Sequence, residues 1–328
     1  MNTYYLGIDV GSVSTNLVLL DESNRVCSKL YLRTQGQPIR ALKEGLRTLK
    51  KSLNGDFHIA GVGTTGSGRQ LAAVMVGADV VKNEITAHAV AALDYCKDVR
   101  TVLEIGGQDS KIIIIRNGIV YDFAMNTVCA AGTGSFLDRQ ASRLNIPIKE
   151  FGSYALRSTT PVRIAGRCAV FAESDMIHKQ QTGHNIEDII NGLCEALVRN
   201  YLNNLAKGKE LLEPILFQGG VAANVGIVAA FERELGKKVI IPEYYDVMGA
   251  VGAAILAKEE IRKKGSTNFY GFELVEREYK AKSFECKSCS NGCEVVEILS
   301  DGHPIARWGD RCGKWQLAEV SHTAITSA

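Results

Sequence analysis

Short apolar segments separated by turn residues predict three strands near the N-terminus, at residues 6–10, 16–21 and 26–33. A helical period follows at about 38–53, and then a strand at 58–62 that ends in a glycine-rich turn. Two further helical periods cover about 67–76 and 84–96. This order, strands followed by helices, is typical of a mixed sheet packed with helices.

The same order then repeats. A second group of three strands is predicted at 101–105, 111–116 and 119–123, with helices at about 131–144, 169–180 and 186–207. A strand at 214–218, a helix at 221–235, a strand at 239–241 and a helix at 247–264 complete the series. The repetition indicates an internal duplication, with a ligand cleft between two α/β lobes. We expect the lobes at 1–100 and 101–266, with the helix at 247–264 either in the second lobe or returning to the first.

Residues 267–328 differ in composition from the two lobes. They lack a long helical period and are rich in Cys, Gly, Ser and charged residues, so we expect a small Cys-rich C-terminal module. The formal net charge of the whole chain is only +2, which gives no argument for nucleic acid as a partner. The N-terminus has no signal-peptide pattern and no apolar run could span a bilayer. We expect a cytoplasmic protein that binds neither nucleic acid nor a membrane.

Three glycine-containing turns carry the candidate nucleotide chemistry. In Gly7-Ile-Asp-Val-Gly-Ser-Val-Ser-Thr15, an Asp at a strand end precedes a tight turn that presents N–H groups, hydroxyls and a carboxylate. A polyphosphate with Mg²⁺ needs these groups. Glu104-Ile-Gly-Gly-Gln-Asp-Ser-Lys111 occupies the same place in the second half, and Phe217-Gln-Gly-Gly-Val-Ala-Ala-Asn224 joins a strand to a helix. Neither the Walker A nor the Rossmann spacing is present.

In this order and spacing, the three turns resemble those of the superfamily of acetate and sugar kinases, heat-shock 70 ATPases and actin, over about residues 4–264. The resemblance implies duplicated ribonuclease H-like, actin-like lobes with ATP or ADP in the interlobe cleft. The first two turns would bracket the phosphates and the third would bind adenosine. Asp9 and Asp109 become candidates for Mg²⁺, and Gln108 for positioning the attacking water. The implied nucleotide-binding residues are Gly11, Ser12, Thr15, Gly106, Gly107, Ser110, Lys111, Gly219, Gly220 and Asn224.

Two cysteines each stand just before a predicted helix. They are Cys129 in Asn126-Thr-Val-Cys-Ala-Ala-Gly and Cys168 in Gly166-Arg-Cys-Ala-Val. The start of a helix lowers the pKa of a thiol, which suits ligation of an anionic iron–sulfur cluster. Because a [4Fe–4S] cluster takes four thiolates, two per chain point to a two-fold homodimer with one cluster on its axis.

Both cysteine segments, together with Ile105–Lys111, closely resemble the activator components of 2-hydroxyacyl-CoA dehydratases and the ATP-binding subunits of benzoyl-CoA reductases. In that family the matching cysteines hold a cluster shared by two subunits. The resemblance implies an ATPase that couples hydrolysis to electron transfer. A ferredoxin or flavodoxin would reduce the cluster. The electron would then pass to a partner metalloenzyme: a 2-hydroxyacyl-CoA dehydratase, a benzoyl-CoA reductase-like enzyme or a double-cubane-cluster protein.

Two other functions fit the same lobes. One is a small-molecule kinase such as a sugar kinase, although the sequence shows no clear sugar-binding set and the cleft segments carry Cys129 and Cys168 instead. The other is a nucleotide-switched redox sensor that keeps the cluster but drives no reaction. Electron transfer coupled to hydrolysis separates the activator from both.

The remaining cysteines fall into two groups. Cys286, Cys289, Cys293 and Cys312 have the spacing of metal ligands, and the first pair forms a Cys-x-x-Cys chelate. They predict a second site that holds either zinc or another iron–sulfur cluster, with His303 as a substitute ligand. The short activators end near the last helix, so this extension departs from them. Cys27, Cys96 and Cys194 have no Cys or His neighbour at ligand spacing, and we expect them to be buried small side chains.

Overall fold

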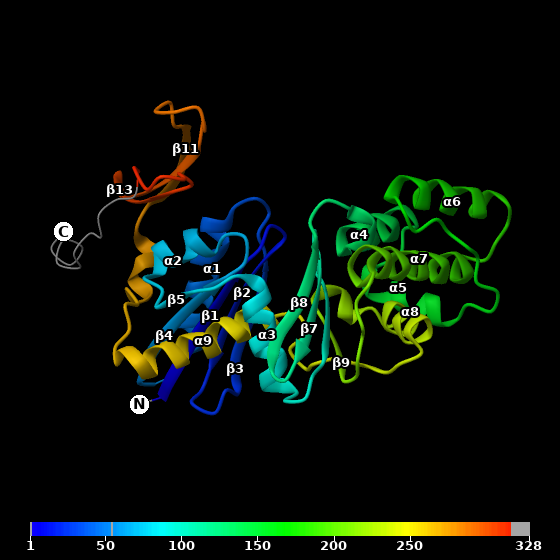
Figure 1. Ribbon diagram of the computed structural model, residues 1–328, viewed down its shortest axis with the longest axis horizontal. Helices are drawn as coiled ribbons and strands as arrows, with labels where there is room; N and C mark the ends of the chain where they lie inside the picture. The colour runs from blue at the N-terminus through cyan, green and yellow to red at the C-terminus, as the bar shows by residue number, and fades with distance from the viewer. Residues whose placement is uncertain (1, 54, 316–328) are drawn as a thin grey trace.

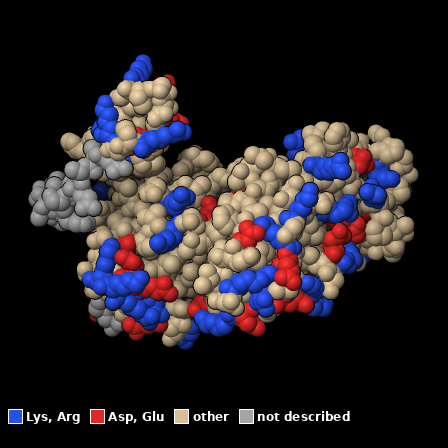
Figure 2. Space-filling view, viewed as in Figure 1, with Lys and Arg blue, Asp and Glu red and all other residues tan. Residues whose placement is uncertain are grey.

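The computed structural model describes residues 2–53 and 55–315. Two lobes of sheet and helix lie side by side, and a small third sheet stands at one end (Figure 1). Within the described residues, no helix combines the length and apolar character needed to cross a membrane. Basic and acidic side chains are interspersed over both lobes on the face seen in Figure 2.

The first lobe is a five-stranded sheet in the order β3-β2-β1-β4-β5. Its central strand β1 runs antiparallel to β2 and parallel to β4. Helix α1 begins at Pro38, which is favourable in the first turn, and it buries Leu42, Leu46 and Leu49 against the sheet. The elements are β1 (Asn2–Val10), β2 (Ser14–Leu20), β3 (Val26–Arg33), α1 (Pro38–Ser52), β4 (Phe57–Thr65), α2 (Arg69–Val76) and β5 (Val80–Val81).

The second lobe repeats this topology, with the order β10-β9-β6-β7-β8. Read from the other edge, the order β8-β7-β6-β9-β10 matches β3-β2-β1-β4-β5 strand for strand, so the predicted duplication is confirmed. The strands are β6 (Thr101–Ile105), β7 (Ser110–Arg116), β8 (Ile119–Asn126), β9 (Ile215–Gln218) and β10 (Val239–Ile240). The helices are α4 (Gly134–Arg143), α5 (Ile148–Leu156), α6 (Ala169–Gln181), α7 (Ile186–Tyr201) and α8 (Val225–Leu235).

Two helices, α3 (Glu84–Tyr95) and α9 (Met248–Lys264), cross closely between the lobes. Helix α9 packs on β1 and β4, so the last long helix lies against the first sheet. The small residues of α9 permit this approach, since a Cβ on Gly252 would lie 1.8 Å from the carbonyl oxygen of Ala87. Helix α3 also packs against the second sheet through Ile85 and Ala89.

The C-terminal sheet is a three-stranded antiparallel meander of β11 (Tyr279–Glu285), β12 (Glu294–Ser300) and β13 (His303–Trp308). The segment before it belongs to the core of the first lobe, because Phe272, Leu274 and Val275 pack with Leu46 and Leu49. Lys43 and Arg47 of α1 donate to the backbone carbonyls of Arg277 and Val275. Residues 316–328 of the predicted module lie outside the described residues.

Candidate functional site

The two matching turns face each other across an interlobe cleft. Gly11 N donates to Ser14 O at 2.8 Å in the β1–β2 turn, and Gly106 N donates to Asp109 O at 3.0 Å in the β6–β7 turn. The turns touch, because a Cβ on Gly107 would lie 2.7 Å from Val13 Cγ2. Most of the predicted nucleotide and catalytic residues line this cleft: Asp9, Gly11, Ser12, Gly106, Gly107, Gln108, Asp109, Lys111, Gly219 and Gly220.

The third turn closes the cleft from the second lobe. Gly219 has φ +89°, and a Cβ there would lie 2.4 Å from Ile105 O, so the position requires glycine. A second pocket continues from the polar cleft and shares Tyr31 and Gly220 with it. Its further lining includes Leu137, Ile148, Val221 and Asn224. A polar compartment joined to a more apolar one suits a polyphosphate joined to a flat base.

Two predicted residues lie away from the cleft, and a third lines the second pocket but also caps a helix. The hydroxyl of Thr15 is buried and lies 3.0 Å from that of Thr34, and the hydroxyl of Ser110 is also buried; neither residue is among those that line the cleft. Asn224 caps α8, with its Oδ1 accepting from Gly226 N at 3.0 Å and from Ile227 N at 3.1 Å. Only its Nδ2 is left without a partner in the described part of the chain.

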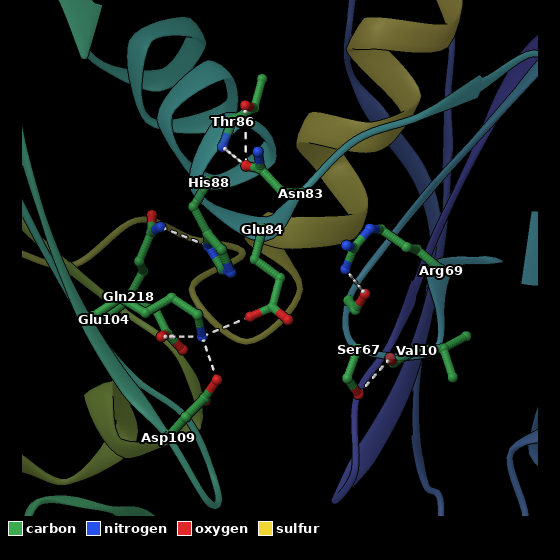
Figure 3. Close-up of polar contacts among 12 residues, drawn as sticks. Val10, Ser67, Arg69, Asn83, Glu84, Thr86, His88, Glu104, Asp109 and Gln218 are labelled. Carbon is green, nitrogen blue, oxygen red and sulfur yellow. Dashed lines mark hydrogen bonds and ion pairs between the residues drawn. The ribbon is translucent and has the colours of Figure 1, made fainter. Parts of the chain in front are cut away.

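Lys111 is the centre of a buried ion cluster on the floor of the cleft. Its ammonium lies 2.8 Å from Glu84, 3.0 Å from Glu104 and 2.8 Å from Asp109 (Figure 3). Glu104 of β6 and Lys111 of β7 lie directly opposite each other in the sheet, so their side chains point to the same face. Three carboxylates contact this single ammonium, and Asp9 is near enough to interact with it electrostatically, so carboxyl groups outnumber the cation in the cleft.

Burial shifts the pKa values of these groups strongly. Desolvation and the charge of Glu84 raise the pKa of Asp9 to about 7. Desolvation also raises the pKa of Glu104 to about 8, against the lowering effect of Lys111. The neighbouring carboxylates hold the pKa of Lys111 well above its usual value, so this side chain stays charged.

His88 and Gln218 were not predicted as site residues. Their side chains meet in the cleft wall, with Gln218 Nε2 2.7 Å from His88 Nδ1 (Figure 3). Burial and the nearby ammonium of Lys111 lower the pKa of His88 to about 3, so the imidazole is neutral. The spacing of Glu84 and His88, one helical turn apart, favours polar residues that face the cleft or a dimer contact, and both side chains line the cleft.

The segments of Cys129 and Cys168 are connected in the second lobe through Asn200, whose Nδ2 lies 3.6 Å from Cys129 Sγ and 2.6 Å from the carbonyl oxygen of Gly166. Cys168 is the residue immediately before α6, and Cys129 immediately precedes a short 3₁₀ turn, Ala130–Gly132, that leads into α4. Asn126 brackets Cys129, accepting from its N–H at 2.9 Å and donating to its carbonyl at 2.9 Å. Both thiols are partly exposed. Near the two cysteines in sequence are three exposed apolar side chains, Val128 (94% exposed), Val170 (68%) and Phe171 (64%).

The four C-terminal thiols lie at one end of the third sheet. Cys286 N donates to Cys293 O at 2.8 Å across the β11–β12 loop that contains Cys289. Cys312 follows β13, in a segment where Lys314 donates to Ser288 of the same loop at 2.5 Å. Residues 2–53 and 55–315 contain no group of three or more His, Cys, Asp or Glu side chains that could hold a metal, so ligation here stays a prediction.

The expectation that three other cysteines are buried holds only for Cys194. Cys27 is exposed, because it occupies an outward position on the edge strand β3. Cys96 is half-buried at the end of α3.

Comparison with known proteins identifies the family to which this chain belongs. A sequence model described as the BadF/BadG/BcrA/BcrD ATPase family matches residues 6–257. The chain belongs to this family. It is 34% identical over 268 residues to the (R)-2-hydroxyglutaryl-CoA dehydratase activating ATPase of Acidaminococcus fermentans, covering 80% of this chain and 100% of that protein. It is also 34% identical over 267 residues to the activator of lactoyl-CoA dehydratase of Anaerotignum propionicum, again covering 80% and 100%.

A solved structure supports the same family assignment. The activator of 2-hydroxyisocaproyl-CoA dehydratase from Clostridium difficile with bound ADPNP superposes with a TM-score of 0.72 at 32% identity, covering 80% of this chain and 97% of that one. As a member of the BadF/BadG/BcrA/BcrD ATPase family, the chain is an ATPase that binds ATP and ADP. The match to the family ends at residue 257, before the third sheet.

Proposed function

We propose that this BadF/BadG/BcrA/BcrD ATPase is a reductive activator: a homodimer that couples ATP hydrolysis to the transfer of a low-potential electron to a partner metalloenzyme. The observation that supports the proposal is the pair Cys129 and Cys168, both partly exposed, in two segments of the second lobe that Asn200 contacts together. Relatives named as activators of CoA dehydratases support the class of partner.

The donor set of these two segments fits a shared cluster. Two thiols per chain become four in a two-fold dimer, which is the number that a [4Fe–4S] cluster takes. The exposed Val128, Val170 and Phe171 beside them supply apolar area for a contact between the two chains. When bound, the cluster would accept and release one electron at low potential, with a small ferredoxin or flavodoxin as its reductant.

The charge of the cleft fits Mg²⁺ bound together with ATP. Within the described chain, no group of three or more His, Cys, Asp or Glu side chains could hold a metal ion by itself, and the carboxylates of Glu84, Glu104 and Asp109 are paired with the ammonium of Lys111. Mg²⁺ in nucleotide sites commonly takes one or two carboxylates together with phosphate oxygens. Asp9 and Asp109 would supply those carboxylates, and the bound cation would neutralise phosphate charge. Gln108, exposed at the tip of the second turn, would orient the water that attacks the γ-phosphate.

The test of the proposed function is ATP-dependent electron transfer by protein handled without oxygen. The protein is reduced with dithionite, and ATP or ADP is added together with a purified 2-hydroxyacyl-CoA dehydratase component. We expect oxidation of the activator with ATP only, and none when Cys129→Ala replaces the native chain. Phosphorylation of a sugar by ATP would favour the kinase. Nucleotide-dependent spectra without electron transfer would favour the redox sensor.

A second proposal concerns the thiols of the C-terminal sheet. We propose that Cys286, Cys289, Cys293 and Cys312 hold one zinc ion or a second iron–sulfur cluster, because all four stand at one end of this sheet. Truncation before the module is a poor test, since it would remove Phe272, Leu274 and Val275 from the core of the first lobe. Zinc and iron contents of the Cys289→Ser variant test it instead. We expect loss of one metal site per chain, and unchanged metal content would contradict the site.

A further inference from the structure

A single buried asparagine connects the two cysteine segments. Asn200, close to the end of α7, is only 3% exposed. Its Nδ2 donates to the carbonyl of Gly166 at 2.6 Å, two residues before Cys168. The same nitrogen lies 3.6 Å from the sulfur of Cys129, within hydrogen-bonding distance for a sulfur acceptor. One amide group therefore contacts both segments that carry the predicted cluster ligands.

The orientation of this amide is determined by its neighbours. Asn204 Nδ2 donates to Asn200 Oδ1 at 3.1 Å. Exchanging the oxygen and nitrogen of Asn200 would place Oδ1 against the carbonyl of Gly166, where two acceptors would repel each other. There is also little free space, because a Cβ on Gly132 would lie 2.8 Å from Asn200 Oδ1. The N–H groups of Asn200 are therefore directed at Gly166 and toward the sulfur of Cys129. The protonated thiol can also donate to Asn200 Oδ1 at 3.8 Å, whereas a thiolate or a ligating sulfur can only accept from Nδ2.

The next residue extends this connection to the nucleotide cleft. The hydroxyl of Tyr201 donates to the carbonyl of Lys111 at 2.5 Å. The ring of Tyr201 is fully buried and packs edge-on against Phe231, with centroids 5.3 Å apart. Adjacent residues of α7 thus contact the lysine at the centre of the ion cluster and the cysteine segments. Directly after Tyr201 the helix changes to a π turn, Leu202–Ala206, a feature that is frequent at functional sites.

Strand β8 provides a second connection between the nucleotide cleft and Cys129. Ser110, beside Lys111, pairs in register with Asn126 at the end of β8. Asn126 in turn holds both backbone groups of Cys129. Cys129 is therefore held from two sides, by β8 and by α7, and both elements contact the Asp109–Lys111 segment of the cleft.

We propose that Asn200 is the positioning residue of the cysteine site, and that Tyr201 links it to Lys111, so that the state of the nucleotide cleft changes the surroundings of Cys129. The inference rests on the proposed function for the identity of the bound cluster, while the contacts themselves involve only this chain. An N–H donated to a ligating sulfur stabilises the more negative, reduced state. Removing the donor should therefore lower the midpoint potential of the cluster.

The first test uses the full chain freed of cluster, so it does not depend on the proposed electron transfer. The rate of alkylation of Cys129 by iodoacetamide is followed by peptide mass spectrometry, with ADP and with a non-hydrolysable ATP analogue. We expect the two rates to differ in the native chain, and their ratio to move to about one in Tyr201→Phe and in Asn200→Ala. Equal rates in the native chain, or an unchanged ratio in both variants, would overturn the link.

Matched controls separate this role from general destabilisation. Tyr279→Phe removes another buried hydroxyl, which donates from the third sheet to the carbonyl of Met75 in the first lobe, and should keep the native ratio. Asn203→Ala changes an exposed asparagine of the π turn that follows α7 and should also keep it. The second test is a redox titration of the loaded dimer, followed by electron paramagnetic resonance. Asn200→Ala should lower the midpoint potential and Asn203→Ala should not; an identical potential in Asn200→Ala would overturn the positioning role.

Discussion

The ammonium of Lys111 lies 2.8 Å from a carboxylate oxygen of Glu84, so a buried ion pair joins β7 of the second lobe to the first turn of α3. Helix α3 packs in turn against α9, which lies on the first sheet. Any change of the interlobe angle must therefore be accommodated at or near this pair. Its position on the floor of the cleft places it where nucleotide charge would act on it.

Replacing Lys111 should destabilise the fold more at high pH than at low pH. Lys111→Met leaves Glu84, Glu104 and Asp109 without a cation, and breaking a buried pair in this way costs roughly 3–5 kcal/mol. The ammonium lowers the pKa values of Glu104 and Asp9 in the native chain, so both rise further without it. The folded variant therefore takes up protons as the pH falls and loses less stability. Urea unfolding at pH 8 and pH 6 measures this. The exposed Lys238→Met is the control, and an equal loss at both pH values would contradict the account.

Nucleotide binding should weaken as the pH falls through about 7. The pKa of Asp9 is raised to about 7, so below this pH the carboxyl is neutral and a poor partner for Mg²⁺. We expect the affinity for Mg·ADP to fall by roughly tenfold per pH unit below the pKa. Isothermal titration from pH 8 to 6 measures it, with Asp9→Asn expected to bind weakly and with a flatter profile. A native profile as flat as that of Asp9→Asn would exclude this role.

Gln108→Ala should slow hydrolysis without loss of nucleotide affinity. The side chain lies at the exposed tip of its turn and makes no hydrogen bond within the described chain that the fold would miss. Loss of a residue that orients the attacking water lowers turnover by roughly 100-fold. Steady-state phosphate release and a separate ADP titration distinguish the two effects. Gln70→Ala, an exposed change on α2, is the control, and native turnover in Gln108→Ala would refute the role.

Gly252→Ala should destabilise the crossing of α3 and α9. The added Cβ would lie 1.8 Å from the carbonyl oxygen of Ala87, so the helices must move apart. Overpacking of this kind costs typically about 1–3 kcal/mol. Thermal unfolding measures the loss, with Glu259→Ala on the exposed side of the same helix as the control. Native stability in Gly252→Ala would mean that the helices are less tightly packed than the structure has them.

Most strands of the two lobes could be predicted from sequence because their signals are local, but the two-residue β5 (Val80–Val81) is too short to give one and was not predicted. Alternation and flanking turn residues placed β3 and β6 at the residues observed, and Pro38 marked the start of α1. The short helix α5 was not predicted, since its nine residues give little period and include Gly152. That glycine is explained only by the fold, because a Cβ there would lie 2.6 Å from Asn224 Oδ1.

The candidate site was predictable where single motifs define it and not where distant segments meet. The turns at Gly11 and Gly106 line the cleft as expected, whereas the role of Lys111 depends on Glu84 from another element. Thr15 and Ser110 stand beside the predicted residues in sequence, but their hydroxyls are buried away from the cleft. The contact of Asn200 with Cys129 joins positions 71 residues apart, and no local pattern contains it.

The most direct test of the central claim is the iron and acid-labile sulfide content of protein purified without oxygen, together with the number of chains per particle in the same sample. A cluster shared by Cys129 and Cys168 of two chains predicts a dimer with about four irons at this site, since one [4Fe–4S] cluster takes four thiolates. That iron should be lost in Cys129→Ala and in Cys168→Ala, whereas any iron held by the C-terminal cysteines would remain. An iron-free native protein, or an iron content that is unchanged in both variants, would contradict the proposed activator.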